Sequence, residues 1–172
     1  MKLFVKQLPA LAREIVEALQ KAGDIIVAKG EMQELVLDFQ AILAEYARAE
    51  REVSMAARDL QAARGWGSER YAEARRMIAN LRKVPLDDDA MEYIARQMIE
   101  FMMISPRVEE VFADDPVIKK RIFDILRRHL EQHRELDQEV RKRLKHLQEG
   151  TRDWEIAYSR TMEQIRRARG LD

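Results

Sequence analysis

Cysteine is absent from this sequence of 172 residues. The chain therefore has no disulfide bond, no thiolate nucleophile and no zinc site built on thiolates, and it suits a reducing compartment. Long apolar runs are absent too, because the most apolar stretch, at 101–104, is far shorter than the roughly 20 residues that cross a bilayer. The first residues also lack the unbroken apolar core of a signal peptide. We therefore expect a cytoplasmic protein that does not enter a membrane.

Aromatic residues, glycine and proline are scarce. Aromatic residues make up 6% of the chain, and there are only six glycines and four prolines. The abundant residues are Ala, Leu, Glu, Arg and Met, which favour helix, and an apolar content of 47% is enough to bury a core. The composition therefore predicts a helical protein.

An excess of one charge is also missing, since 31 Lys and Arg residues balance 31 Asp and Glu residues. No overall field draws the chain toward nucleic acid or an anionic membrane, so an electrostatic partner must be bound by a local patch. Catalytic motifs are absent as well: the sequence has no P-loop, no Gly-x-Gly-x-x-Gly and no Gly-x-Ser-x-Gly. We expect a protein that is not an enzyme and uses no cofactor.

The most regular pattern that is present lies in residues 31–64. Its apolar residues recur at spacings of four and three, beginning with Leu35, Phe39 and Ile42, and no glycine or proline interrupts them. This spacing is typical of a helix that lies lengthwise against other helices. At 1.5 Å per residue, such a helix is about 50 Å long.

Shorter elements surround this helix, and their order occurs twice. The first half is predicted to contain a helix ending at Gly23, an extended run at 24–28, the long helix at 31–64 and a helix ending before Pro85. The second half is predicted to contain a helix from Ala90 to about Ile104, an alternating run at 107–112, a long helix ending at Glu149 and a helix ending near Arg169. A shift of 83 positions places Leu35 on Ile118, and a shift of 84 places Ile78 on Met162.

We therefore predict an all-α fold, an elongated helical domain built from two duplicated halves, residues 1–85 and 86–172, that share one core. Each half runs helix, short extended segment, long helix, helix. The two long helices are expected to bury their apolar faces against each other about a pseudo-twofold axis. The two extended segments can pair as a minor two-stranded sheet.

Several stretches resemble one known family. They are the opening MKL, LAREIVEAL at 11–19, EYARAEREV at 45–53, SPRVEEVFADD at 105–115 and EVRKRLKHLQEGTRDWEIAY at 139–158. Together they resemble a bacterial family catalogued only as a domain of unknown function, the five-hundred-and-seventh in that series. The resemblance covers nearly the whole chain and implies a mostly helical bacterial cytoplasmic protein. It implies no activity, cofactor or catalytic residue.

His129 and His133 are candidate metal ligands because they lie one helical turn apart and can share a face with Glu131. The repeat places His129 on Tyr46, an apolar-face position, so a core residue is the simpler interpretation. No Glu-x-x-His pair or His-Glu-x-x-His motif is present. We expect no metal site; an alternative role for His129 is to fix helix register or to make packing pH-sensitive.

Basic residues occur near the ends of two equivalent helices. They are Arg75, Arg76, Arg82 and Lys83 in the first half and Arg160, Arg166, Arg167 and Arg169 in the second. Paired clusters of this kind could hold the phosphates of RNA or DNA. The simpler interpretation is that they complement helix dipoles and keep the surface hydrated.

Candidate protein contacts are Trp66 and Trp154, which follow the ends of the long helices, and Met98 and Met102, which belong to a methionine-rich helix face. The tryptophans can instead cover helix ends, and the methionines can instead form core. Acidic residues at 87–89, 92, 109–110 and 114–115 could present a negative face to a basic partner.

From these features we expect a non-catalytic helical protein of the bacterial cytoplasm that acts in protein–protein interaction or assembly, with an unidentified protein or a second copy as partner. The alternative is a nucleic-acid or ribonucleoprotein-associated factor that uses the paired basic helix ends.

Overall fold

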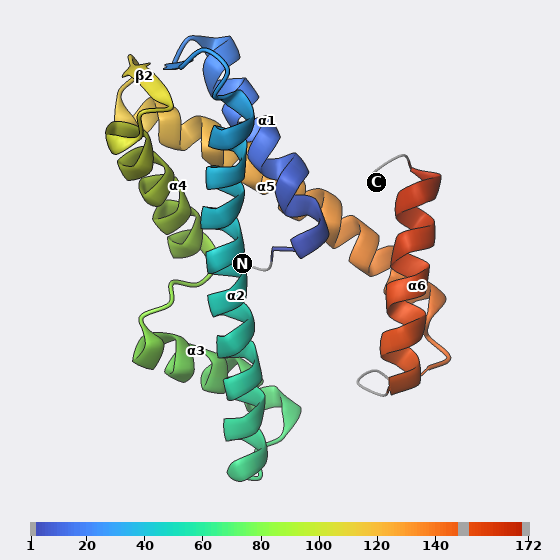
Figure 1. The fold of residues 1–172 in the computed structure, drawn as a ribbon. Coiled ribbons are helices and arrows are strands. Elements are labelled where there is room, and N and C mark those ends of the chain that lie inside the picture. Colours follow the sequence, from blue (N-terminus) through green and yellow to red (C-terminus); the bar gives the residue numbers. More distant parts are fainter. Residues whose placement is uncertain (1–2, 148–151, 170–172) are drawn as a thin grey trace. The chain divides into compact units, whose positions relative to one another are not determined.

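The computed structural model describes residues 3–147 and 152–169 and contains two compact units, residues 1–126 and 127–172. The chain is all-α apart from one small antiparallel sheet, as predicted (Figure 1). None of the described helices combines the length and apolar content needed to cross a bilayer.

The elements follow one another in the predicted order. The first unit contains η1 (Val5–Gln7), α1 (Leu8–Ala22), β1 (Ile25–Val27), α2 (Met32–Ala63), η2 (Ser68–Arg70), α3 (Tyr71–Arg82), α4 (Asp87–Ile104), β2 (Val108–Val111) and the start of α5 (Asp115–Arg143). The second unit contains the rest of α5 and α6 (Arg152–Ala168). The long helix predicted at 31–64 is confirmed.

The second long helix is shorter than predicted, because it ends at Arg143 and not at Glu149. The amide of Leu147 donates to the carbonyl of Leu144 at 2.9 Å, so a tight turn replaces the next helical turn. Leu144 and Leu147 both pack on the core of the second unit, which favours the turn over a longer helix.

Helix α1 shows how local sequence sets a boundary. Pro9 lies in its first turn, where a missing backbone N–H costs nothing. Gly23 ends the helix with φ +75°, and the amide of Asp24 donates to the carbonyl of Leu19 at 3.0 Å. This bond pattern needs a left-handed residue, which glycine adopts at little cost.

Helix α2 is the central element of the first unit, and its close neighbours are α1, α3 and α4. Its buried face includes Leu35, Phe39 and Val53, so the predicted apolar stripe is confirmed. The helices α1, α3 and α4 lie along it. The predicted lengthwise pairing of α2 with the second long helix stays a prediction.

The two extended segments pair as predicted. Strands β1 and β2 are antiparallel, with Ile25 opposite Val111 and Val27 opposite Val108. The sheet joins the connection between α1 and α2 to the connection between α4 and α5. An ion pair between Arg121 of α5 and the buried carboxylate of Asp24 lies beside it.

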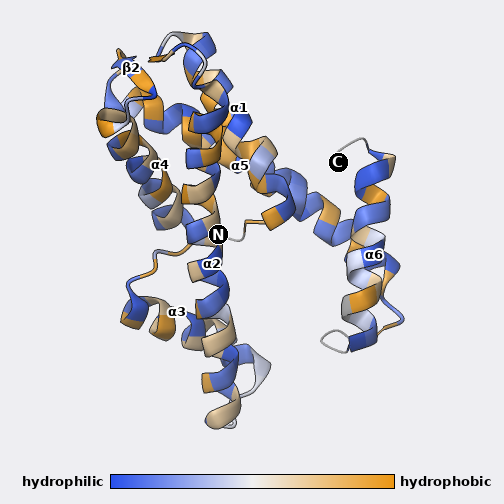
Figure 2. Ribbon diagram, in the orientation of Figure 1, coloured by the Kyte–Doolittle hydropathy of each residue, from blue (hydrophilic) through white to orange (hydrophobic). Residues whose placement is uncertain are grey.

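The second unit has a separate small core formed by Leu136, Val140, Leu144 and Ile165, with Leu147, Trp154, Ala157, Tyr158 and Met162 packed around it. The orange and blue segments of Figure 2 show the apolar and polar residues along the elements of both units. Asp137 lies beside this core and accepts hydrogen bonds from the Tyr158 hydroxyl at 2.6 Å and from Arg141 Nε at 2.8 Å. Partial burial raises the pKa of the Asp137 carboxyl, but these two hydrogen bonds outweigh it and hold the pKa below its ordinary value.

The boundary between the compact units falls inside α5, whereas the predicted repeats meet at residues 85 and 86. The two divisions describe different things, since one concerns spatial packing and the other concerns internal sequence similarity. The duplication into 1–85 and 86–172 stays a prediction.

Candidate protein-binding surface

One end of the first unit carries an exposed apolar surface, which we call the sheet-end surface. It comprises Ile26 of β1, Met103 and Ile104 at the end of α4, Phe112 directly after β2, and Val117 in the first turn of α5. Figure 1 shows the end of α4, strand β2 and the start of α5 at the same end of this unit. Ile104 is 83% exposed and Phe112 is 56% exposed.

Sheet geometry explains why two of these side chains face solvent. Ile25 and Val27 point into the core and Ile26 between them points outward, because side chains alternate along a strand. The amide of Phe112 donates to the carbonyl of Asp24 at 2.9 Å, which extends the pairing one residue beyond Val111. Phe112 therefore lies on the outer face with Ile26.

Helix geometry explains the contribution of α4. Met98 and Met102 lie one turn apart on the buried stripe of α4, whereas the next two residues, Met103 and Ile104, turn away from it. The helix ends there because Pro106 follows and Ser105 is extended. The apolar pattern of α4 therefore continues past the part of the helix that packs.

Carboxylates border the sheet-end surface. They are Glu109 and Glu110 of β2 together with Asp114 and Asp115 before and at the start of α5, and all four are exposed. Their side chains have no ion-pair or hydrogen-bond partner within residues 3–147 and 152–169. An exposed apolar surface bordered by unpaired negative charge suits a partner that is apolar and basic.

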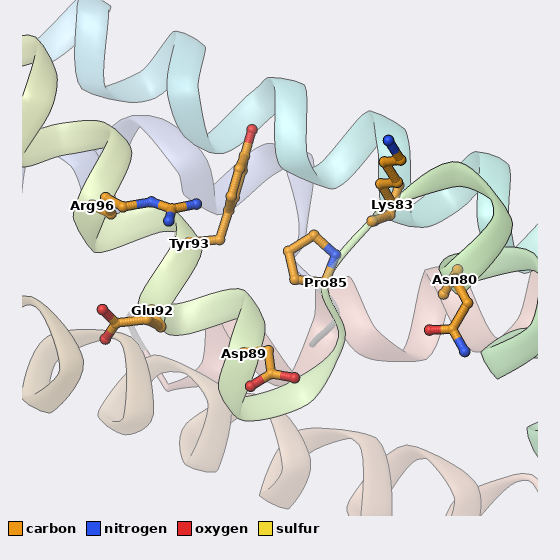
Figure 3. A pocket seen from close by; sticks show the side chains of 9 residues that line it. Asn80, Lys83, Pro85, Asp89, Glu92, Tyr93 and Arg96 are labelled. Carbon is orange, nitrogen blue, oxygen red and sulfur yellow. The ribbon is translucent and has the colours of Figure 1, made fainter.

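A concave feature, the interhelical groove, lies between the end of α3 and the start of α4. Its volume is about 450 Å³, and it is lined by Ala79, Asn80, Lys83, Val84, Pro85, Asp89, Glu92, Tyr93 and Arg96 (Figure 3). Residues 89, 92, 93 and 96 share one face of α4 because their spacing is that of a helix.

Buried polar groups hold the linker that forms one wall of this groove. The Tyr46 hydroxyl donates to the carbonyl of Pro85 at 3.2 Å. Burial raises the pKa of the Tyr46 phenol, and the neighbouring Glu50 carboxylate raises it further, so the hydroxyl keeps its proton and remains a donor. Arg75 contacts Glu50 at 2.8 Å and reaches Asp87 at 4.0 Å. These contacts tie α2, α3 and the first residue of α4 together.

The predicted basic clusters are largely occupied by acidic partners. Arg75 and Arg82 of α3 pair with Glu50 and Glu52 of α2. The other two residues of the first cluster, Arg76 and Lys83, are exposed, and Lys83 also lines the groove. The first cluster therefore serves mainly to attach α3 to α2.

The second cluster lies in the other unit. Arg169 pairs with Glu139, Arg166 and Arg167 also have partners, and Arg160 is exposed on α6. The structure therefore does not show two equivalent, open basic sites.

The predicted protein contacts have other roles. Met98 and Met102 are buried in the core of the first unit, so the prediction that they contact a partner is wrong. Trp66 is half-buried, with the Arg70 guanidinium 3.7 Å from its ring centroid. Trp154 is half-buried and stacks on Tyr158 with a centroid distance of 4.9 Å. Each tryptophan therefore packs on a residue of its own unit, and its contact with a partner stays a prediction.

His129 and His133 are half-buried on the part of α5 that belongs to the second unit, and both interact with neighbouring residues. Over the described ranges, no three His, Cys, Asp or Glu side chains are grouped as a metal site would require.

Sequence reasoning identified the acidic border but missed the apolar residues inside it. The stretch VEEVF at 108–112 contains the apolar residue, but strict alternation would place Phe112 on the same buried face as Val108. The bulge in this sheet moves Phe112 to the opposite, outer face. The register shift between Ile26 and Val27 is a tertiary feature.

The chain matches one protein-family model over nearly its whole length. A family model described as "Protein of unknown function (DUF507)" matches residues 1–171. The resemblance found in the sequence motifs is thereby confirmed. No curated protein matches the chain.

Proposed function

Because the chain belongs to DUF507, a family of unknown function, its role must be argued from its own surface, and we propose that it is a non-catalytic protein-interaction or assembly factor of the bacterial cytoplasm. It binds a protein partner through the sheet-end surface.

The observation that carries this proposal is the exposed group of Ile26, Met103, Ile104, Phe112 and Val117 within a border of unpaired carboxylates. Large apolar side chains grouped at one exposed end of a unit often mark a site of protein–protein contact. Phe112 and Ile104 are the natural anchors, because large apolar side chains near the centre of an interface supply most of its binding energy. The border then selects partners with positive charge.

An amphipathic helix with Lys or Arg beside its apolar face is the partner structure that fits best. Such a helix buries apolar residues at helical spacing and places its charges at the edge of the contact. Glu109, Glu110, Asp114 and Asp115 lie close to Phe112 and Val117 along the chain, are exposed and can meet those charges. A second copy of the chain and an unrelated protein are both compatible with this chemistry.

One observation favours the alternative, binding to nucleic acid. The first unit holds 19 of the 31 basic and 22 of the 31 acidic residues, so the second unit holds 12 basic and 9 acidic residues. The balanced chain thus has an acidic first unit and a basic second unit. The second unit is where contact with phosphates would occur.

Site-specific photocrosslinking in the native cells tests the proposed function. The photoreactive residue p-benzoylphenylalanine replaces Phe112 or Ile104, and Met55, an exposed apolar residue of α2, serves as the control position. We expect positions 104 and 112 to yield an adduct with the same protein and position 55 to yield none. Glu109→Lys with Glu110→Lys should reduce the adduct, because the border then repels a basic partner.

Adducts of equal yield at position 55, or no protein adduct at 104 and 112, would contradict the proposal. Binding of single-stranded RNA that falls steeply with salt, and that the changes at 109 and 110 do not weaken, would support the alternative.

A further inference from the structure

We propose that the interhelical groove is a second binding site, which takes an acidic side chain and its apolar neighbour from an extended peptide segment of a protein partner. This proposal does not depend on the sheet-end surface, because it rests on the residues between α3 and α4.

The groove separates its donors from its carboxylates. Figure 3 shows the Lys83 ammonium and the Tyr93 hydroxyl pointing to the same side of Pro85, whereas Asp89 and Glu92 lie on the other side. The Arg96 guanidinium lies 6.0 Å from the centroid of the Tyr93 ring. A carboxylate above Pro85 would therefore meet an ammonium and a phenol, with a second cation nearby.

Of the two carboxylates that line the groove, Glu92 is paired with another cation, and Asp89 lies on the side of Pro85 away from these donors (Figure 3). Glu92 forms an ion pair with Lys119 of α5, and Arg96 reaches Glu100 at 3.9 Å. The Lys83 ammonium has no partner in the part of the chain that the structure describes. Lys83 is thus the cation that remains available to a ligand.

The backbone at Lys83 indicates that its side chain is needed. Gly23, Gly65 and Lys83 end α1, α2 and α3 respectively, and all three have positive φ. In each case the next residue donates a hydrogen bond back to the carbonyl five residues before it. Two of these ends use glycine, which adopts this conformation at low cost, whereas the third uses lysine with φ +56°. Glycine would satisfy the backbone at Lys83 equally well, whereas lysine in addition places an ammonium beside the groove.

The apolar part of the ligand has a surface on which to lie. The Pro85 ring and the Tyr93 ring form the middle of the groove, between the charged groups (Figure 3). A volume of about 450 Å³ is larger than a carboxylate needs and suits a few peptide side chains. An acidic residue with an apolar neighbour therefore matches the charge and the shape together.

Contacts beneath the linker position one wall of the groove in the absence of a ligand. Tyr46 fixes the carbonyl of Pro85, and the pair of Glu50 and Arg75 fixes the approach to Asp87. A preformed wall lowers the entropy that binding costs. Tyr46, Glu50 and Arg75 therefore shape the binding site as well as stabilise the fold.

Titration followed by two-dimensional amide NMR on the full chain tests the proposal. The probes are acetyl-Leu-Glu-Leu-amide and its neutral counterpart acetyl-Leu-Gln-Leu-amide. We expect the amides of Asn80, Lys83, Val84 and Tyr93 to shift with the Glu peptide in a saturable way, with at least fivefold weaker binding of the Gln peptide.

Variants at Lys83 then separate binding from folding. Lys83→Gly should lower the affinity for the Glu peptide at least tenfold. Its melting temperature should stay equal or rise, because glycine adopts the left-handed conformation without strain. Lys83→Arg should keep most of the affinity. Lys29→Ala, at an exposed lysine in the turn before α2, is the matched control and should bind as the wild type does.

Equal affinity for the Glu and Gln peptides, shifts confined to residues outside the groove, or unchanged binding by Lys83→Gly would overturn the proposal. A failure here leaves the sheet-end surface untouched, because its test uses positions 104 and 112.

Discussion

Glu50 places a carboxylate on the buried face of α2, where only 7% of the residue is exposed. Arg75 Nη2 donates a hydrogen bond to this carboxylate at 2.8 Å, and the Ser54 hydroxyl donates a second one at 3.0 Å. A buried charge is tolerated only when it is paired and hydrogen-bonded, because it has lost its water. The nearby pair of Arg82 and Glu52 joins the same two helices but lies in solvent. Two ion pairs of the same residue types therefore differ in burial and in geometry, and we expect them to differ in energy.

Arg75→Ala is expected to lower the free energy of unfolding by about 3 kcal/mol, because it leaves the Glu50 carboxylate buried without its cation. Arg82→Ala, the control, should cost less than about 1 kcal/mol, since exposed pairs contribute little. Urea unfolding of both variants measures the difference. Glu50→Leu added to Arg75→Ala should recover much of the loss, because no charge is then buried. Equal losses for the two arginine variants would contradict this account.

At the scale of elements, the small sheet joins two segments of the first unit that are far apart in the sequence. Each strand buries one side and exposes the other, so a single strand serves both the core and the sheet-end surface. Ile25 and Ile26 are adjacent and chemically identical, yet Ile25 is buried and Ile26 is 43% exposed. Their roles differ because of strand pairing, which residue type cannot reveal.

Ile25→Ala should destabilise the protein by about 2–4 kcal/mol, because it removes buried methyl groups and leaves a cavity. Ile26→Ala should change stability by less than about 0.5 kcal/mol, as expected for a surface position, and should instead reduce crosslinking to the partner from position 112. Thermal or urea unfolding and the crosslinking yield give the two readouts. Similar destabilisation by both variants would show that β1 does not pair in this register.

At the scale of the whole molecule, two compact units of unequal size each have their own core. The second unit spans residues 127–172, and its buried apolar residues are Leu136, Val140, Leu144 and Ile165. A small core buries little apolar area and contributes correspondingly little stability. The first unit has a larger core built on α1, α2 and α4.

Hydrogen exchange of the full chain should therefore show two levels of protection. Amides of α6 are expected to open at a lower free energy than the central amides of α1 and α2, because local stability follows the buried contacts around each segment. Ile165→Ala should abolish protection in α6 while leaving α1 and α2 protected as before. Loss of protection in both units together would mean that they unfold as one cooperative body.

Several features of this protein were determined by its sequence alone. The spacing of apolar residues in 31–64 predicted α2 to within one residue at each end. The runs at 24–28 and 107–112 predicted both strands, and Gly23 and Pro85 predicted helix boundaries. These predictions succeeded because hydrophobic period, glycine and proline act on the nearest turns of the chain.

Only the tertiary structure decided which surfaces meet. An apolar stripe specifies a buried face but not the element that covers it, so the sequence did not reveal that α1, α3 and α4 all pack on α2. For the same reason, the sequence did not show that Met102 is buried while Met103 is exposed, or that Arg75 pairs with Glu50. These outcomes depend on free energies summed over contacts distant in the sequence, and no local pattern records that sum.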